Sequence, residues 1–222
     1  MIKLIQTKQN NKLSAKWLSK LAMGAAMCLG LSFGLSSAAN AGIKIGEPAP
    51  EFTLTNSMGE TVSLNDYKGK HVVLEWTNHQ CPYVVKHYDS DNMQSLQRKY
   101  TDKDVVWLSI ISSAPGKQGY VKADEANQLT ESRKADPNHV LFDPEGDVGK
   151  AYTAKTTPHM YIINPDGILE YAGGIDSIKS ANPKDIPKAV NYVDVGLSAL
   201  LAGQSIEKTL PPPYGCSIKY KS

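Results

Sequence analysis

Short apolar runs alternate with amphipathic segments along the middle of the chain. Residues 71–76 (HVVLEW) and 105–111 (VVWLSII) are rich in β-branched and aromatic residues, which is typical of buried strands. Residues 82–100 between them favour a helix, with a break at Asp89-Ser90-Asp91. A strand, a helix and a strand in this order predict a β-α-β unit with parallel strands.

Turn residues separate shorter elements on either side of this unit. Residues 47–70 alternate apolar and polar positions around the turn 57–59, which predicts an edge hairpin. Later, residues 160–164 and 168–173 flank the turn Asn164-Pro165-Asp166-Gly167, which predicts two antiparallel neighbours. The other expected elements are a helix at 119–134, a short strand at 139–142 and a brief helix at 147–152.

Helical spacing returns near the end of the chain. The apolar positions are Ile186, Val190, Val193, Leu197, Leu200 and Leu201. With Pro187 near the start and Gly203 at the end, they predict a terminal amphipathic helix. A proline-led tail that carries Cys216 follows over residues 204–222.

The first 41 residues have a different composition from the rest. Lysines precede the apolar run 21–35, and Ala39 and Ala41 stand in an A-x-A arrangement. This pattern predicts a secretory signal peptide over residues 1–41, cut after Ala41, and therefore a periplasmic protein. The apolar run is shorter than the ~20 residues of a spanning helix, so we expect no stable membrane anchor after cleavage.

The leader also explains the small positive charge of the chain. The 222 residues carry 24 basic and 22 acidic side chains, and residues 1–41 contribute lysines but no acid. The remaining residues are slightly acidic, so they provide no basic surface for nucleic acid. With 41% hydrophobic residues the chain has enough apolar content for the core of one domain, which we place at 42–203.

Cys81 is the first candidate for chemistry. It follows a predicted buried strand, and Pro82 suits the first position of the next helix. A cysteine at a helix N-terminus has a stabilised thiolate, which attacks disulfides and peroxides. His79, Lys86 and His87 would add positive charge if they face the sulfur. The alternative is an inert buried cysteine or one half of a structural disulfide.

A Cys-Pro at a helix start, followed much later by Thr157-Pro158 before a strand hairpin, resembles the thioredoxin superfamily. The opening GEPAPEFTLTNSMGETVSLNDYKGKHVVLEW is similar to its peroxiredoxin-like branch, the AhpC/TSA and TlpA-like redoxins. The resemblance implies an α/β thioredoxin fold, a central mixed β-sheet flanked by helices with an N-terminal hairpin extension. It also implies a cis Thr157-Pro158 bond, which forms the wall for a substrate backbone opposite Cys81. Pro82 and Tyr83 would line the same groove.

Two positions depart from the patterns of the superfamily. Val84 stands where thioredoxins have their second cysteine, so no local dithiol exists. Asn78 stands where peroxiredoxins have threonine or serine, and neither Arg98 nor Arg133 lies in a recognisable motif. The substrate is therefore either a peroxide or a protein disulfide, with electrons from a thiol-donor redox protein. No Gly-rich phosphate loop follows any predicted strand, and we expect no organic cofactor.

Two further residues complete the candidate site. Glu75 lies six residues before Cys81, where thioredoxins carry a buried carboxylate that handles protons; alternatively it is a charged residue on the solvent side of its strand. Cys216 is the second cysteine after the leader and a possible resolving thiol for Cys81. The function predicted is that of an exported, antioxidant or disulfide-exchanging thiol oxidoreductase with a redox-active centre.

Two other readings of the same residues stay open. The first is a non-catalytic module in which Cys81 and Cys216 form a permanent structural disulfide. The second is a copper-binding chaperone that uses Cys81 with His79, His87 and His159. It has less support, because soft thiolates select Cu(I) and such sites normally have two cysteines close together. We therefore expect no metal site.

Overall fold

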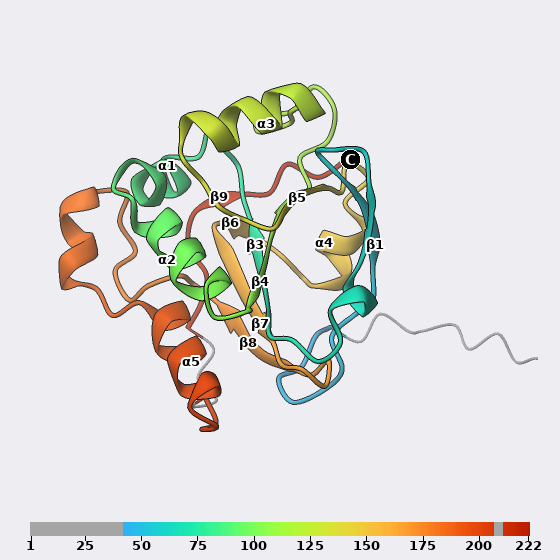
Figure 1. Cartoon of the computed structure of the whole chain (residues 1–222). Coiled ribbons are helices and arrows are strands. Elements are labelled where there is room, and N and C mark those ends of the chain that lie inside the picture. Colours follow the sequence, from blue (N-terminus) through green and yellow to red (C-terminus); the bar gives the residue numbers. More distant parts are fainter. Residues whose placement is uncertain (1–41, 207–210) are drawn as a thin grey trace, which may run out of the picture. The chain divides into compact units, whose positions relative to one another are not determined.

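The computed structural model describes residues 42–206 and 211–222, so the predicted leader lies outside the described residues. The strands are β1 (Thr53–Asn56), β2 (Thr61–Ser63), β3 (Val72–Trp76), β4 (Val106–Ile111), β5 (His139–Phe142), β6 (Thr156–Thr157), β7 (His159–Ile163), β8 (Leu169–Gly173) and β9 (Cys216–Ser217). The α-helices are α1 (Pro82–Asp89), α2 (Asn92–Thr101), α3 (Ala123–Ser132), α4 (Asp147–Ala151) and α5 (Tyr192–Leu201), and 3-10 helices cover Leu64–Tyr67 and Pro183–Lys188 (Figure 1).

The main sheet has the strand order β2-β1-β5-β4-β3-β7-β8, and β6 pairs with β9 in a small second sheet. Strands β3, β4 and β5 are parallel, whereas β7 runs antiparallel to β3 and β8 antiparallel to β7. The first hairpin, β1 and β2, closes one edge of the sheet. The predicted β-α-β unit, both hairpins and the mixed sheet of a thioredoxin fold are confirmed.

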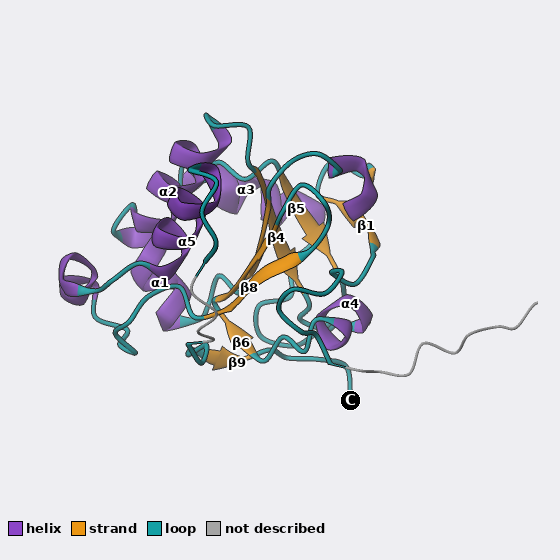
Figure 2. Cartoon of the chain, turned by 90° about the horizontal axis from the view of Figure 1, so that it is seen from below, coloured by secondary structure: helices purple, strands orange, loops and turns teal. Residues whose placement is uncertain are grey.

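Each face of the sheet has its own apolar core because alternate strand residues point to opposite faces. On β3, Leu74 and Trp76 belong to the core that includes residues of the N-terminal segment and Tyr152, next to α4. Val73 belongs to the core built with α1, α2 and α5. Figure 2 shows these three helices on one side of the sheet and α4 on the other.

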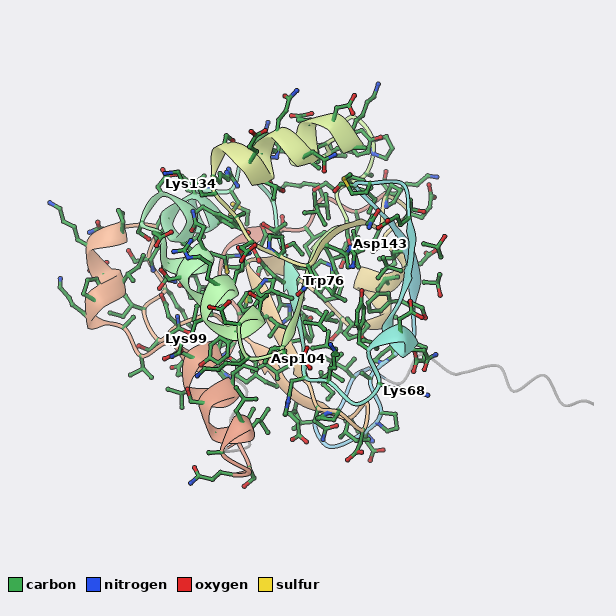
Figure 3. All side chains as sticks on the ribbon, in the orientation of Figure 1. Lys68, Trp76, Lys99, Asp104, Lys134 and Asp143 are labelled. Atoms are coloured by element: carbon green, nitrogen blue, oxygen red, sulfur yellow. The ribbon has the colours of Figure 1, made fainter. Side chains whose placement is uncertain are left out.

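Apolar side chains of the strands are buried and many charged side chains are exposed, as the sequence pattern predicts. Trp76 is fully buried and lies in the interior in Figure 3. The labelled lysines Lys68, Lys99 and Lys134 are exposed and extend outward. Among residues 42–206 and 211–222, no helix has the length and apolar character that a bilayer span requires.

Two predicted helices begin later than the sequence suggested. The expected helix at 119–134 is α3, which starts at Ala123, because Gly119 adopts a positive φ of 86° against the Asn78 side chain. The predicted terminal helix from Ile186 is wrong in its first part. Pro187 lies inside a separate 3-10 helix, and α5 begins after Asn191, whose side chain caps it.

Candidate functional site

Cys81 caps the N-terminus of α1, and its side chain is fully buried. Pro82 occupies the first helical position, as the sequence predicted, and the Val84 and Val85 N–H groups donate to the Cys81 carbonyl. The preceding loop is held by Asn78, whose side chain accepts a hydrogen bond from the Gln80 N–H at 2.9 Å. These contacts hold the sulfur of Cys81 at the positive end of the helix dipole.

The residues before β7 form the wall opposite Cys81. The Thr157-Pro158 peptide bond is cis, as the resemblance implied. The Cys81 thiol donates a hydrogen bond to the Thr157 carbonyl oxygen at 3.1 Å. Residues more than seventy positions apart in the sequence therefore meet at the sulfur.

Cys216 contacts the same sulfur. Strand β9 runs antiparallel to β6 with Cys216 opposite Thr157, and the Cys216 N–H donates to Cys81 Sγ at 3.4 Å. Both cysteines are free thiols. The sequence left open whether Cys216 reaches Cys81, and the structure brings the two together.

The two thiols differ in their pKa values. Burial alone would raise the pKa of Cys81, but hydrogen bonds from the Cys216 thiol, the Val84 backbone and the Cys216 backbone lower it below the ordinary value. Burial and the neighbouring Cys81 sulfur raise the pKa of Cys216 to about 11. Because the thiolate is the attacking form, this difference favours Cys81 as the nucleophile and leaves Cys216 protonated.

Glu75 is buried within β3, so its alternative interpretation as a solvent-side residue is wrong. Tyr88, Trp107, Ser109 and Gln97 all donate hydrogen bonds to its carboxylate, at 2.8 to 3.2 Å. Burial raises the pKa of Glu75, and these four donors oppose the rise. The group can therefore hold a proton at a higher pH than an exposed glutamate.

Pro82 and Tyr83 lie at the mouth of the site. Pro82 is exposed, and the half-buried Tyr83 ring contacts the Tyr214 ring edge-on at a centroid distance of 5.7 Å. Tyr214 belongs to the tail, two residues before Cys216. The ring that the sequence predicted to line a substrate groove is thus in contact with the protein's own C-terminal segment.

A buried polar cluster beneath the tail was not found by sequence reasoning. Lys86 forms an ion pair with Asp176 at 3.2 Å, and the Tyr214 hydroxyl donates to the same carboxylate at 2.6 Å. His87 lies within 3.4 Å of the Tyr214 hydroxyl. Lys86 and His87 would add charge at Cys81 only if they faced the sulfur, and both side chains instead contact Asp176 and Tyr214. No local spacing in the sequence links residues 86, 176 and 214.

The histidines named for a metal site have other contacts. His159 is buried, and its Nδ1 lies 2.9 Å from the Tyr161 hydroxyl. The carbonyl of His79 accepts a hydrogen bond from Arg133 at 2.9 Å. In the part of the chain that the structure describes, no three His, Cys, Asp or Glu side chains are arranged to hold a metal ion.

Comparisons with known proteins identify the family and the fold of the chain. A family model described as the AhpC/TSA family matches residues 45–172, more than half of the chain. Thioredoxin-like protein YneN of Bacillus subtilis is 30% identical over 130 residues, which are 58% of this chain and 71% of that protein. Thiol-disulfide oxidoreductase ResA of Bacillus cereus is 27% identical over 146 residues, 64% of this chain and 74% of that protein.

Solved structures show the same fold over most of both chains. An uncharacterized conserved protein of Geobacillus kaustophilus has a TM-score of 0.68 and 30% identity, and the match covers 80% of this chain and 93% of that one. A hypothetical protein of Sinorhizobium meliloti 1021 also has a TM-score of 0.68, at 20% identity, over 81% and 96% of the two chains.

Proposed function

Since the chain belongs to the AhpC/TSA family and has a thioredoxin fold, we propose that it is an exported thiol-disulfide oxidoreductase with Cys81 as its nucleophile. The observation that carries the proposal is the contact between Cys216 and the Cys81 sulfur. Cys216 donates its backbone N–H to the Cys81 sulfur, and the pKa of Cys81 is lowered while that of Cys216 is raised. Such a pair provides one attacking thiolate and one resolving thiol.

The reaction proceeds in two thiol exchanges. The Cys81 thiolate attacks a substrate disulfide, its S–S bond breaks, and the leaving sulfur takes the electron pair and a proton. Cys216 then loses its proton and attacks Cys81, which releases the second substrate thiol and leaves a Cys81–Cys216 disulfide. Two electrons have moved to the substrate. A partner dithiol protein restores the reduced pair, and no metal or organic group takes part.

The surrounding residues have defined roles in this proposal. Thr157 and Pro158 form the wall for the substrate backbone, and Pro82 and Tyr83 line the entrance. Glu75 is a proton-holding residue within β3, because its pKa is raised by burial. Its hydrogen bonds with Tyr88 and Ser109 link it to α1 and β4.

Peroxide reduction is the second candidate, and the full burial of Cys81 favours it, because a small oxidant fits where a protein does not. The thiolate would attack one peroxide oxygen, the O–O bond would break, and water or an alcohol would leave. The resulting sulfenic acid would condense with Cys216, release water and form the same disulfide. Asn78 stands against this candidate, because peroxiredoxins have threonine or serine at this position; its side chain is hydrogen-bonded to the Gln80 N–H and the Gln118 carbonyl.

One experiment separates the candidates. The reduced protein is mixed with glutathione disulfide or with hydrogen peroxide, quenched with acid, and mapped by mass spectrometry. We expect the Cys216→Ser variant to stop at a Cys81–glutathione mixed disulfide, and the unsubstituted protein to reach the Cys81–Cys216 bridge. A Cys81→Ser variant that reacts as fast as the unsubstituted protein would contradict both candidates. Faster reaction with peroxide than with the disulfide would favour the peroxidase.

Export to the periplasm is the cellular part of the proposal. It rests on the lysines, apolar run and A-x-A arrangement of residues 1–41. We expect N-terminal sequencing of the protein from a periplasmic fraction to begin at Gly42. Recovery of the protein from the cytoplasmic fraction with residues 1–41 still attached would contradict the proposed export. It would not bear on the proposed thiol chemistry.

A further inference from the structure

The tail lies in the site as an added strand. Strand β9 pairs antiparallel with β6, which ends at the cis Thr157-Pro158 bond, and Figure 2 shows the two strands side by side. This pairing sets Cys216 opposite Thr157 and against the Cys81 sulfur. An extended peptide that adds to a sheet edge makes contacts of the same kind. The tail therefore stands where a substrate peptide would have to lie.

An aromatic side chain anchors this strand two residues before its cysteine. The buried Tyr214 ring contacts Tyr83 edge-on, and the Lys86 ammonium lies 5.6 Å from its centroid. The Tyr214 hydroxyl donates to Asp176 at 2.6 Å. A recess of one aromatic residue, one cation and one carboxylate selects a phenol ring with a hydroxyl at its end.

The residue between the anchor and the cysteine must be glycine. Gly215 has a φ of 140°, and a Cβ built there would lie 2.0 Å from the Thr157 carbonyl oxygen. That distance is far below van der Waals contact with a backbone atom. The edge of β6 thus fits the order tyrosine, glycine, cysteine.

Access to Cys81 depends on this segment. The Cys81 side chain is fully buried, and the Cys216 backbone lies over its sulfur. A protein disulfide cannot approach the sulfur while β9 is in place. The two strands share two residue pairs, so their backbone pairing contributes little stability by itself, and the Tyr214 anchor is the contact for which a docking peptide must compete.

We propose that the edge of β6 is a docking site for an extended tyrosine–glycine–cysteine peptide, and that the protein's own tail occupies it until such a peptide displaces it. The inference rests on the proposed function, since Cys81 must attack the docked disulfide. In that step the Cys81 sulfur bonds to the peptide cysteine, the peptide's S–S bond breaks, and the departing thiolate takes a proton from water. The tail then returns with Cys216 to resolve the mixed disulfide.

The test measures a sequence preference in the full chain carrying Cys216→Ser. The probes are the peptide Pro-Pro-Tyr-Gly-Cys-Ser-Ile and a shuffled peptide with the same residues, each with its cysteine in a disulfide with a coloured aromatic thiol. A small symmetric aromatic disulfide reports the reactivity of Cys81 itself. Adding Gly215→Ala forces β9 away from Thr157. Gly203→Ala is the matched control, because Gly203 also has a positive φ but open space at its Cβ.

We expect the matched peptide to react about ten times faster or more after Gly215→Ala, since overpacking against backbone shifts such an equilibrium at least that far. On the opened variant we expect it to react faster than the shuffled peptide. A matched-to-shuffled rate ratio near one on the opened variant, or a matched-peptide rate that Gly215→Ala leaves unchanged, would overturn the docking site. A synthetic peptide of residues 211–222 with serine for cysteine should slow the matched peptide on the opened variant, and no competition would also overturn it. Failure of the small disulfide to modify Cys81 would instead reject the proposed function.

Discussion

Cys81 and Cys216 are both free thiols, but their surroundings shift their pKa values in opposite directions. The hydrogen bonds around Cys81 favour its thiolate, and the pKa of Cys216 is raised to about 11 by burial and by the neighbouring sulfur. Each residue's behaviour therefore depends on the other. The same dependence holds for Lys86 and Asp176, which are buried together with His87 and form an ion pair.

Removing the Cys216 thiol should raise the pKa of Cys81. The Cys216→Ala variant loses the donor that stabilises the Cys81 thiolate, so less thiolate is present at neutral pH. We expect alkylation of Cys81 by iodoacetamide near pH 7 to slow severalfold, with the midpoint of its pH profile moved upward. Cys216→Ser keeps a hydroxyl donor and should move the midpoint less. Identical profiles for all three proteins would show that the contact does not tune Cys81.

His87 should make the protein less stable in mild acid. Burial, and then the charge of Lys86, lower its pKa from 6.5 to about 4, although Asp176 opposes them. The unfolded chain binds this proton at a higher pH than the folded protein, so the contribution of His87 is complete above pH 6.5 and declines as the pH falls toward 4.

We expect the free energy of unfolding, from urea titrations across this window, to fall by on the order of 3 kcal/mol more in the unsubstituted protein than in His87→Gln. Above pH 6.5, the difference in the free energy of unfolding between the two proteins measures the hydrogen bonds that the substitution removes. Equal pH slopes for the two proteins would show that His87 is not held neutral by the fold.

At the scale of elements, the start of α5 shows that a local apolar pattern does not determine where a helix begins. The helix begins after Asn191, whose Oδ1 accepts a hydrogen bond from the Asp194 N–H at 3.0 Å. The apolar spacing from Ile186 suggested an earlier start. However, Val190 is 54% exposed. The backbone N–H of Tyr192 donates a hydrogen bond to the Ile175 carbonyl, in a different part of the chain.

Loss of this cap should cost stability with no change in the site. Asn191→Ala removes the acceptor for the Asp194 N–H, and we expect the free energy of unfolding in urea to fall by about 1 kcal/mol. Asn191→Asp retains the acceptor and should be close to neutral. The exposed neighbour Val190→Ala serves as the control, with a change of less than about 0.5 kcal/mol. An equal loss in all three variants would contradict a role for the cap.

Elements with a strong local signal were predictable, and long-range partners were not. The strands β3 and β4 and the hairpin around Asn164 follow from β-branched runs and turn residues within a few positions. Glu75, Cys81 and Thr157-Pro158 could be singled out because they resemble a known arrangement. The pairing of β9 with β6 and the contact of Asp176 with Tyr214 were missed, because each joins segments that no periodicity connects.

At the scale of the whole described chain, the tail contributes to both cores. Tyr214 packs in the core with α1 and α2, whereas Ile218 packs in the core on the opposite face of the sheet. Tyr220 then lies against Gly146 and Gly149, where any Cβ would collide with its ring. Cys216 lies between these anchors, so its position depends on the packing of the entire domain.

A bridge between the cysteines should make stability depend on redox state. The two residues are 135 positions apart, and closing so long a loop stabilises a fold by about 5 kcal/mol in the chain-entropy model. We expect urea unfolding of the oxidised protein to require this much more free energy than that of the reduced protein. The Cys216→Ser variant should show no redox dependence. Equal stabilities of the oxidised and reduced unsubstituted protein would contradict the bridge.

The same separation has a consequence for the newly made protein. Cys216 leaves the ribosome 135 residues after Cys81, which at usual elongation speeds is a delay on the order of ten seconds. Strand β6 and the tail are both made within that interval. Until Cys216 has been made, Cys81 lacks its partner thiol, and any oxidant or cysteine nearby meets an uncovered sulfur. Synthesis of β9 therefore ends a period in which Cys81 is open to oxidation, and the timing of synthesis becomes part of the protein's redox chemistry.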